Sequence, residues 1–349
     1  MSISCVDLFC GAGGLTHGFV KEGLPVVAGI DLDGACRYPY EQNNKSIFIE
    51  KDVCEFTSGE LVDLYSDSEI RILAGCAPCQ PFSTYSHRYD MNRNSRWSLL
   101  NEFSRLSREV KPEIVTMENV PSVKDHEVFQ NFVSELESSG YSVWHKVIDS
   151  SCYGVAQTRK RLVLLASLFG PIEIIKPTHK KAITVKKAIG NLKPIKAGET
   201  DPKDTLHCAS GLSELNLQRI KASKPGGTWR DWPKELIASC HQSQSGKTYS
   251  GVYGRMEGDK PGPTMTTQCY GFGNGRFGHP EQDRAISLRE AAILQGFPRN
   301  YKFIPPDQPL YKGPLGRMIG NAVPVGLGQA IAKSIKSHLE KYGKIKATN

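Results

Sequence analysis

Asp7-Leu8-Phe9-Cys10-Gly11-Ala12-Gly13-Gly14 is the stretch of sequence that decides the fold. It ends an apolar run, residues 4–9, and precedes an amphipathic segment, residues 15–22, so it predicts a glycine-rich loop between a strand and a helix. Glycines have no Cβ atom, and the backbone N–H groups of such a loop can approach a ligand closely. A ligand site is therefore expected where this strand ends.

The alternation of short apolar runs with amphipathic segments continues through the first ~170 residues, as in stacked β-α units. We predict further strands at 25–30, 71–74, 114–117 and 161–168, and further helices at 99–110, 128–138, 287–295 and 325–342. The strand at 161–168 is continuously apolar, which is typical of a strand buried on both faces. The sequence therefore favours a parallel α/β domain, interrupted by a second module and completed by C-terminal helices.

Composition excludes several classes of protein. The chain has 349 residues, 39% hydrophobic and 23% charged, which suits two globular domains. No apolar run approaches the ~20 residues of a membrane span, and the N-terminus lacks the basic segment of a signal peptide. Ten cysteines then indicate free thiols in a reducing compartment. The net charge of +8 suggests a polyanionic partner.

Two carboxylates follow the next two predicted strands. Asp31 lies twenty residues after Gly11, where an acid can bind ribose hydroxyls, and Asp52 could accept from an adenine amino group. A nicotinamide enzyme competes with this interpretation, but Thr16 occupies the place of the third glycine of G-x-G-x-x-G. An ordinary strand–helix turn with solvated acids is an equal alternative for this loop taken alone.

A second loop, Gly75-Cys76-Ala77-Pro78-Cys79-Gln80-Pro81-Phe82-Ser83, also follows an apolar strand. Its Cys-x-x-Cys pair could be a redox motif, half of a zinc site, or a nucleophile at the carboxyl end of a strand. No second Cys-x-x-Cys exists, so we expect no metal, and a nearby nucleotide-type site does not suit a thioredoxin-like fold. A buried inert cysteine remains the general alternative.

Six motifs then appear in an order that resembles the DNA (cytosine-5)-methyltransferases, from residue 4 to about 335 except for roughly 175–260. They are Phe9-Cys10-Gly11-Ala12-Gly13-Gly14, Pro78-Cys79-Gln80-Pro81-Phe82-Ser83, Met117-Glu118-Asn119-Val120, Gln157-Thr158-Arg159-Lys160-Arg161, Arg289-Glu290 with Gln295-Gly296-Phe297-Pro298, and Gly320-Asn321-Ala322-Val323-Pro324. The resemblance implies the class I S-adenosylmethionine-dependent methyltransferase fold, a Rossmann-like mixed sheet with a smaller inserted target-recognition domain. The expected domains are catalytic and cofactor-binding at 1–174, target-recognition at 175–280, and a return to the catalytic domain at 281–349.

The resemblance also assigns catalytic roles. Carbon 5 of cytosine is a poor nucleophile, and thiolate addition at C6 loads electron density onto it. That thiolate would be Cys79. Glu118 would hold or share a proton at N3, which a dry pocket favours because burial disfavours a charged carboxylate. Asn119 could orient Glu118, Arg161 would bind cytosine O2, and Arg159 would lie beside the catalytic pair on the same side as Arg161.

The implied methyl donor is S-adenosylmethionine. The family's cofactor-binding positions fall on Phe9, Gly11, Gly13, Asp31, Leu32, Asp52, Val53, Leu99 and Asn321. The implied partner is double-stranded DNA, from which the target base must flip into the pocket. Candidates for contacts with DNA are Gln80, Ser83, Arg255, Thr264, Gln268 and Arg276.

The leading interpretation is the modification enzyme of a restriction–modification system, with a cognate restriction endonuclease as functional partner. We expect it to be a monomer in the bacterial cytoplasm, associated with the nucleoid and not with a membrane. The tRNA-methylating branch of the same family is an alternative, although its Cys-Phe-Thr signature is absent from residues 175–280. A DNA-binding relative without catalysis is another, against which the set of Cys79, Glu118 and Arg161 argues. Cys76 departs from the family, whose members often carry a small residue there, and a Cys76–Cys79 disulfide that inactivates reversibly is one hypothesis.

Overall fold

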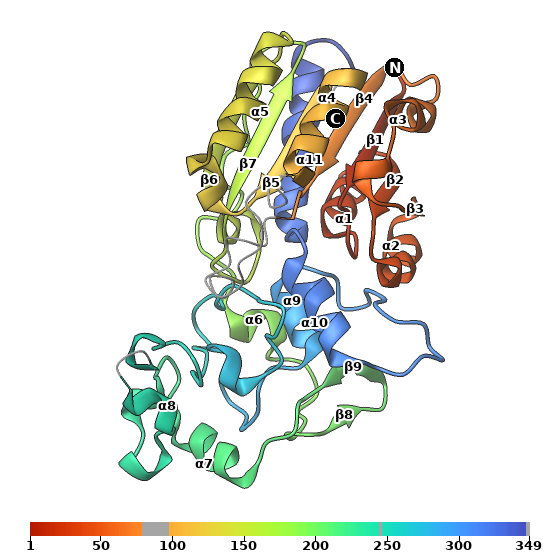
Figure 1. Cartoon of the computed structure of the whole chain (residues 1–349). Helices are drawn as coiled ribbons and strands as arrows, with labels where there is room; N and C mark the ends of the chain where they lie inside the picture. Colours follow the sequence, from red (N-terminus) through yellow and green to blue (C-terminus); the bar gives the residue numbers. More distant parts are fainter. Residues whose placement is uncertain (79–97, 244–245, 347–349) are drawn as a thin grey trace. The chain divides into compact units, whose positions relative to one another are not determined.

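The computed structural model describes residues 1–78, 98–243 and 246–346 of the chain (Figure 1). The chain folds into two compact units. Unit 1 comprises Met1–Tyr153, Lys160–Pro177 and Val323–Asn349, and unit 2 comprises Gly154–Arg159 and Thr178–Ala322. No helix in the described ranges is long and apolar enough to cross a bilayer.

A seven-stranded mixed sheet forms the centre of unit 1, in the order β3-β2-β1-β4-β5-β7-β6. Its strands are β1 (Ile3–Leu8), β2 (Val26–Asp31), β3 (Ile47–Glu50), β4 (Ile70–Gly75), β5 (Ile114–Asn119), β6 (Ser142–Asp149) and β7 (Lys160–Ser167). The first five run parallel, and β7 is antiparallel to both of its neighbours. The order reverses at β1, so a crevice for ligands is expected where β1 and β4 diverge. This confirms the Rossmann-like mixed sheet expected from the sequence.

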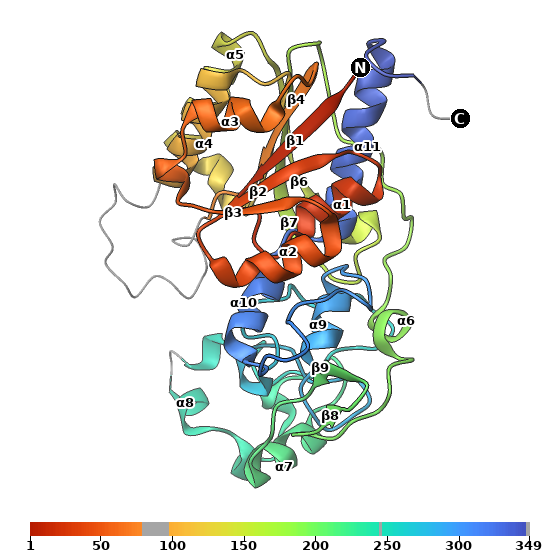
Figure 2. The ribbon, with the colours of Figure 1, turned by 90° about the vertical axis from the view of Figure 1, so that its right-hand side faces the viewer.

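Helices cover both faces of this sheet (Figure 2). One face carries α3 (Ser58–Tyr65), α4 (Ser98–Val110) and α5 (Glu127–Ser138), and the other carries α1 (Gly14–Lys21) and α11 (Val325–Lys341). A Cβ atom on Gly18 of α1 would lie 2.7 Å from backbone atoms of α11, so the two helices touch closely. The C-terminal helix therefore packs back beside the first β-α unit.

Most predicted elements of unit 1 agree with the structure to within one or two residues. The sequence prediction missed α2 (Arg37–Asn44), α3 and β6, and it placed a strand before Asp52, now seen as β3, without giving its bounds. The β6 strand lies at the edge of the sheet and carries partly exposed residues through its length, including His145 and Lys146. It therefore lacks the alternation of buried and exposed positions that marks a strand in sequence.

Unit 2 contains little regular structure. Its elements are α6 (Val185–Ile189), β8 (Thr200–Asp201), β9 (Asp204–Cys208), α7 (Glu214–Ala222), α8 (Ser239–Gln242), α9 (Leu288–Leu294) and α10 (Lys312–Asn321). Short 3-10 turns also occur in both units: η1 (Gly34–Cys36), η2 (Val53–Glu55), η5 (Pro121–Asp125), η6 (Ser150–Tyr153), η7 (Trp229–Asp231), η8 (Lys234–Leu236), η9 (Gly246–Thr248) and η10 (Phe272–Asn274). A small core packs Ile220, Trp229, Trp232, Phe272 and Ala285 together.

Unit 2 also contains a buried ion pair. Arg284 forms two hydrogen bonds of 2.7 Å to the carboxylate of Glu290, and both side chains are at most 1% exposed. Glu290 also closes the capping box of α9 with Ser287, at the start of the helix predicted over 287–295. Arg289 of α9 also pairs with the carboxylate of Asp204 at 2.6 Å, and residues 281–322 belong to unit 2, whereas the sequence analysis expected a return to the catalytic domain from 281 onward.

Candidate active site

The glycine-rich loop turns sharply between β1 and α1. Phe9, Gly11 and Gly13 all have positive φ angles, of 59°, 50° and 84°. Positive φ favours glycine, and Gly13 forms the N-cap of α1 in the left-handed conformation. A Cβ atom on Gly11 would meet no heavy atom within 4 Å, so open space adjoins this position. The backbone of this loop is therefore accessible to a ligand.

Asp31 joins this loop from the neighbouring strand. Its Oδ2 accepts a hydrogen bond of 2.8 Å from the Gly11 N–H, and its Oδ1 accepts one of 2.9 Å from the Asp33 N–H. Burial raises the pKa of Asp31, and these two hydrogen bonds oppose that shift. The structure thus brings together the loop and the first acid, as the spacing of twenty residues predicted.

The other expected cofactor residues of unit 1 flank this acid. Asp52 follows β3, which pairs with β2 through Asp31 and Glu50, and its Oδ1 accepts from the Cys54 N–H at 2.9 Å. Leu32 is 67% exposed, whereas Val53 is buried. Leu99 is half-buried in the first turn of α4. Asn321 is different, because it is exposed at the end of α10 in unit 2.

These residues fit S-adenosylmethionine. Two carboxylates at neighbouring strand ends can accept from hydroxyl and amino groups, and the open space beside Gly11 leaves room near backbone N–H groups. Phe9 and Leu32 add apolar surface beside the same strand ends. The arrangement suits a nucleoside-containing cofactor of this kind.

Asp7 is a buried acid that the sequence analysis left without a role. The Thr16 hydroxyl donates to its Oδ2 at 2.6 Å. Burial raises the pKa of Asp7 to about 7, and the hydrogen bond from Thr16 works against that rise. Thr16, which replaces the third glycine of a dinucleotide fingerprint, therefore ties α1 to β1.

Glu118 lies at the carboxyl end of β5, next to two side chains from other segments. It is 3% exposed. The Cys76 thiol, immediately after β4, donates to its Oε2 at 2.9 Å, and Arg161 Nε of β7 lies 3.0 Å from its Oε1. The Arg161 side chain is 12% exposed. The contact between Glu118 and Arg161 is an ion pair without hydrogen-bond alignment, since Oε1 accepts no hydrogen bond within the described part of the chain.

Asn119 fastens the cysteine-bearing segment to β5. Its Nδ2 donates to the Ala77 carbonyl oxygen at 3.1 Å, and its Oδ1 accepts from the Val120 N–H at 2.8 Å. The Asn119 side chain therefore orients the segment that carries Cys76, and Asn119 is linked to Glu118 through their peptide bond. The expected nucleophile Cys79, with Gln80 and Ser83, lies outside the described residues, which stop at Pro78 and resume at 98.

Arg159 belongs to unit 2, unlike Arg161. It is 3% exposed, and its guanidinium donates to the carbonyl oxygens of Met265 at 2.9 Å and Gly320 at 3.0 Å. The Gln157 side chain of the same motif donates to the Leu294 carbonyl oxygen at 2.9 Å. The structure therefore joins three of the sequence motifs inside unit 2, with Arg159 at their centre.

The residues expected to contact DNA differ in their solvent exposure and in the hydrogen bonds that they already make. Gln268 is exposed, and Thr264 donates to the Thr158 carbonyl oxygen at 2.8 Å. Arg276 is half-buried and donates to the Gly226 and Gly227 carbonyl oxygens.

Arg255 requires a correction. It is 5% exposed, and its guanidinium donates at 2.6 Å both to the Ile220 carbonyl oxygen and to the carboxylate of Asp283. It also donates to the carbonyl oxygens of Ser223, His279 and Gln282. Arg255 therefore stabilises the interior of unit 2 and is not a groove-contacting side chain as expected.

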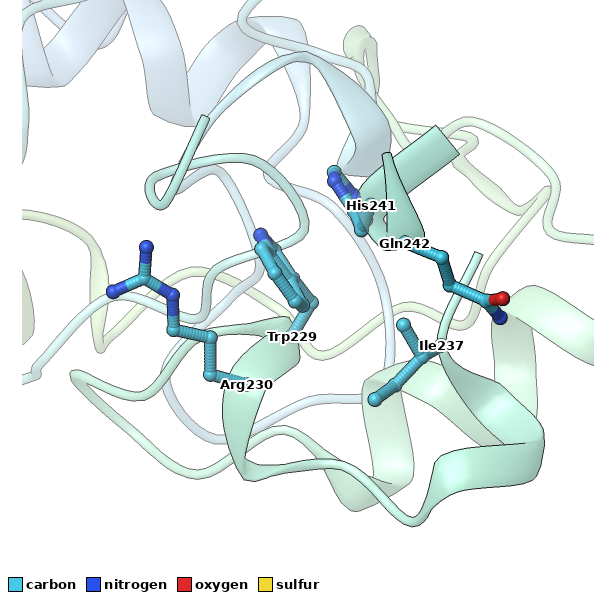
Figure 3. Close-up of a pocket in the computed structure, with 5 residues that line it drawn as sticks. All are labelled: Trp229, Arg230, Ile237, His241 and Gln242. Carbon is cyan, nitrogen blue, oxygen red and sulfur yellow. The ribbon is translucent and has the colours of Figure 1, made fainter. Parts of the chain in front are cut away.

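Unit 2 also contains a hollow of about 550 Å³ that the sequence analysis did not identify (Figure 3). It is lined by Trp229, Arg230, Ile237, His241 and Gln242. Trp229 and His241 stack face to face with ring centroids 4.3 Å apart. The only sequence signal for this hollow is the Trp-Arg pair at 229–230, which does not by itself indicate which residues it meets.

Comparisons with known proteins agree on one family. The family model described as "C-5 cytosine-specific DNA methylase" matches residues 3–337. The chain is 55% identical to the type II methylase M.HgiDII of Herpetosiphon aurantiacus, covering 96% of this chain and 95% of that protein. It is 31% identical to the type II methyltransferase M.Eco47II of Escherichia coli, covering 97% and 80%.

Solved structures show the same fold. A prophage-encoded protein of Escherichia coli, assigned as a DNA modification methyltransferase, superposes with a TM-score of 0.76 at 21% identity, covering 97% of this chain and 100% of that one. The Dnmt2 methyltransferase of S. pombe superposes with a TM-score of 0.66 at 15% identity, covering 97% and 99%. The fold expected from the sequence is thus confirmed.

Proposed function

Because the chain belongs to the C-5 cytosine-specific DNA methylase family and is a DNA (cytosine-5)-methyltransferase, we propose that it methylates a cytosine flipped out of a specific double-stranded DNA sequence, with S-adenosylmethionine as the donor and Cys79 as the nucleophile. The observation that carries this proposal is the buried carboxyl of Glu118 beside Arg161, next to the segment that leads into Cys79. S-adenosylmethionine supplies an electrophilic methyl group when bound.

The Cys79 thiolate forms a bond to C6 of the base, and C5 becomes nucleophilic as the ring loses aromaticity. C5 then takes the methyl group, and the donor would leave as S-adenosylhomocysteine. A base later removes the C5 proton, and the bond between C6 and the sulfur breaks, which restores the ring and the thiolate. The position of Cys79 in the Pro-Cys motif, after a strand that adjoins β5, supports this role.

Glu118 holds or shares a proton with N3, so that negative charge does not accumulate on the ring. Its burial supports this role, because little water reaches the carboxyl to compete with the base. Arg161 offers a cation to the cytosine O2 from the other side of the carboxyl. Arg159 supports the pair indirectly, by fixing the segment of unit 2 that leads into β7.

The cofactor is held by Phe9, Gly11, Gly13, Asp31, Leu32, Asp52, Val53 and Leu99, and Asn321 is the ninth cofactor position that the family resemblance implies. Asp31 accepts from the ribose hydroxyls, and Asp52 accepts from the adenine amino group. The two acids are suited to these roles because each follows a strand end and already accepts backbone N–H bonds that fix its direction.

Unit 2 reads the DNA. Flipping the base costs on the order of a few kcal/mol, which contacts with phosphates and with the remaining strand must offset. Gln80, Ser83, Thr264, Gln268 and Arg276 are the proposed contacts, and the net charge of +8 favours binding to a polyanion.

The biological setting is a restriction–modification system. The relatives named as type II methylase and type II methyltransferase support this proposal. A cognate restriction endonuclease is the functional partner, and the enzyme acts as a monomer at the nucleoid in the cytoplasm.

Transfer of a radiolabelled methyl group from S-adenosylmethionine tests the proposal, with duplex DNA and tRNA as parallel substrates. We expect label in the duplex DNA, and bisulfite sequencing of that DNA should locate 5-methylcytosine at one recurring sequence. Label in tRNA with none in DNA, or label on adenine, would overturn the proposal.

A further inference from the structure

The Glu118 carboxyl has two oxygens in different surroundings. The Cys76 thiol donates to Oε2 at 2.9 Å, whereas Oε1 is buried and accepts no hydrogen bond among the residues that the structure describes. Cys76 and Arg161 are the ionisable side chains of this part of the chain that contact the carboxyl. Oε2 therefore accepts a hydrogen bond from the protein, whereas Oε1 lies against Arg161 with no hydrogen bond of its own in the ranges that the structure describes.

The backbone fixes the thiol in this position. Cys76 is the first residue after β4, and the register between β4 and β5 pairs Gly75 with Met117, so Cys76 comes next to Glu118. Gly75 itself is closely packed, since a Cβ atom there would lie 2.8 Å from the Phe103 ring. The bond from Asn119 to the Ala77 carbonyl oxygen holds the other side of Cys76.

A thiol suits this task because it is a weak donor. A strong donor to Oε2 would favour the charged carboxylate and oppose proton sharing with a base, whereas no donor would leave the carboxyl free to rotate. Arg161 already supplies a strong cation at the other oxygen. We propose that Cys76 is a positioning residue, whose thiol holds Oε2 of Glu118 so that Oε1 faces cytosine N3.

This inference rests on the proposed function, because it assumes that Glu118 acts on the base. The test measures kcat, KM and the pH profile of methyl transfer for wild type, Cys76→Ala and Cys76→Ser. Cys240→Ala, which removes an exposed thiol from unit 2, is the matched control and should behave as wild type. Thermal unfolding of each variant checks that it is folded.

For Cys76→Ala we expect kcat to fall about tenfold with little change in KM for S-adenosylmethionine, as when one hydrogen bond to a charged group is lost. Loss of the thiol favours the protonated carboxyl, so the high-pH limb of the kcat profile should move to higher pH. Serine is the stronger donor, so Cys76→Ser should hold the carboxyl in place, move the same limb to lower pH, and give a kcat between those of Cys76→Ala and wild type.

Profiles that superimpose on wild type, or alanine and serine variants that shift alike, would overturn the positioning role. A purely structural role for Cys76 would change stability without these opposite shifts. The proposed function fails separately, if wild-type enzyme forms no covalent adduct with duplex DNA containing 5-fluorocytosine. An adduct in wild type combined with unshifted profiles in both variants would therefore reject the role of Cys76 alone.

Discussion

The strand ends of unit 1 and the loops of unit 2 position their functional residues by different means. In unit 1 the parallel register sets Gly11 beside Asp31 and Cys76 beside Glu118. The candidate functional residues therefore lie at the carboxyl ends of neighbouring strands. Unit 2 has little sheet, and a buried ion pair between Arg284 and Glu290 holds its loops instead. The comparison teaches that one unit is ordered by backbone pairing and the other by buried charge.

The largest effect is expected where the strand ends of unit 1 perform chemistry. Glu118→Gln keeps the shape of the side chain but cannot hold and release a proton, so methyl transfer should slow by about 10²–10⁴-fold. Steady-state kinetics measure this loss, and calorimetry should find binding of S-adenosylmethionine unchanged. Glu137→Gln, which alters an exposed carboxyl on α5, is the control and should leave kcat intact. Equal rates in the two variants would contradict the role of Glu118.

Removal of a buried charge should lower the stability of unit 2 by more than removal of a partly exposed charge lowers the stability of unit 1. Arg284→Met leaves Glu290 buried without its partner, and unit 2 should lose about 3–5 kcal/mol of stability. Arg71→Met breaks the Arg71–Glu113 pair of unit 1, whose side chains are 28% and 19% exposed, and should cost about 1 kcal/mol.

Hydrogen exchange of each unit measures these losses. After the Arg284→Met substitution the amides of unit 2 should exchange faster, while those of the sheet in unit 1 keep their protection. If both variants loosen both units equally, unit 2 is not stabilised by buried charge in the way we infer.

The two units should respond to pH in opposite directions. Burial lowers the pKa of His279 in unit 2 from 6.5 to about 4, so the stability that comes from keeping this ring neutral is lost as pH falls between these values. In unit 1 burial raises the pKa of Asp7 from 3.8 to about 7, so the stability that comes from its protonated form is lost as pH rises between these values. Each group contributes at most about 3–4 kcal/mol over its full range.

Hydrogen exchange at pH 7 and pH 5, corrected for the intrinsic rates, should show weaker protection of unit 2 at pH 5 and equal or stronger protection of unit 1. His279→Gln should reduce the response of unit 2, because the titrating ring is gone. Parallel loss of protection in both units at pH 5 would show that neither group governs local stability.

The sequence predicted unit 1 well because its signals are local. Apolar runs mark the strands, and Asp31, twenty residues after Gly11, lies against the glycine-rich loop. The contact between Cys76 and Glu118 could not be predicted, because it depends on the register between two strands far apart in sequence.

Arg255 shows why unit 2 was harder. A glycine-rich loop with an arginine is equally consistent with a groove contact and with a simple connector, and only the folded chain shows that five acceptors inside unit 2 surround Arg255. Which arginine is buried depends on long-range partners such as Asp283, and a local pattern does not carry that information. The same holds for the hollow beside Trp229 and His241.

The most direct test of the covalent mechanism is to trap the enzyme on duplex DNA that contains 5-fluorocytosine, in the presence of S-adenosylmethionine, and to map the attached peptide by mass spectrometry. The fluorine at C5 cannot leave as a proton does, so the bond to C6 should persist after denaturation. We predict that the modified peptide carries the pyrimidine on Cys79 and that Cys79→Ala yields no adduct. An adduct that persists in Cys79→Ala, or wild-type enzyme that methylates the DNA without ever being trapped, would contradict the account.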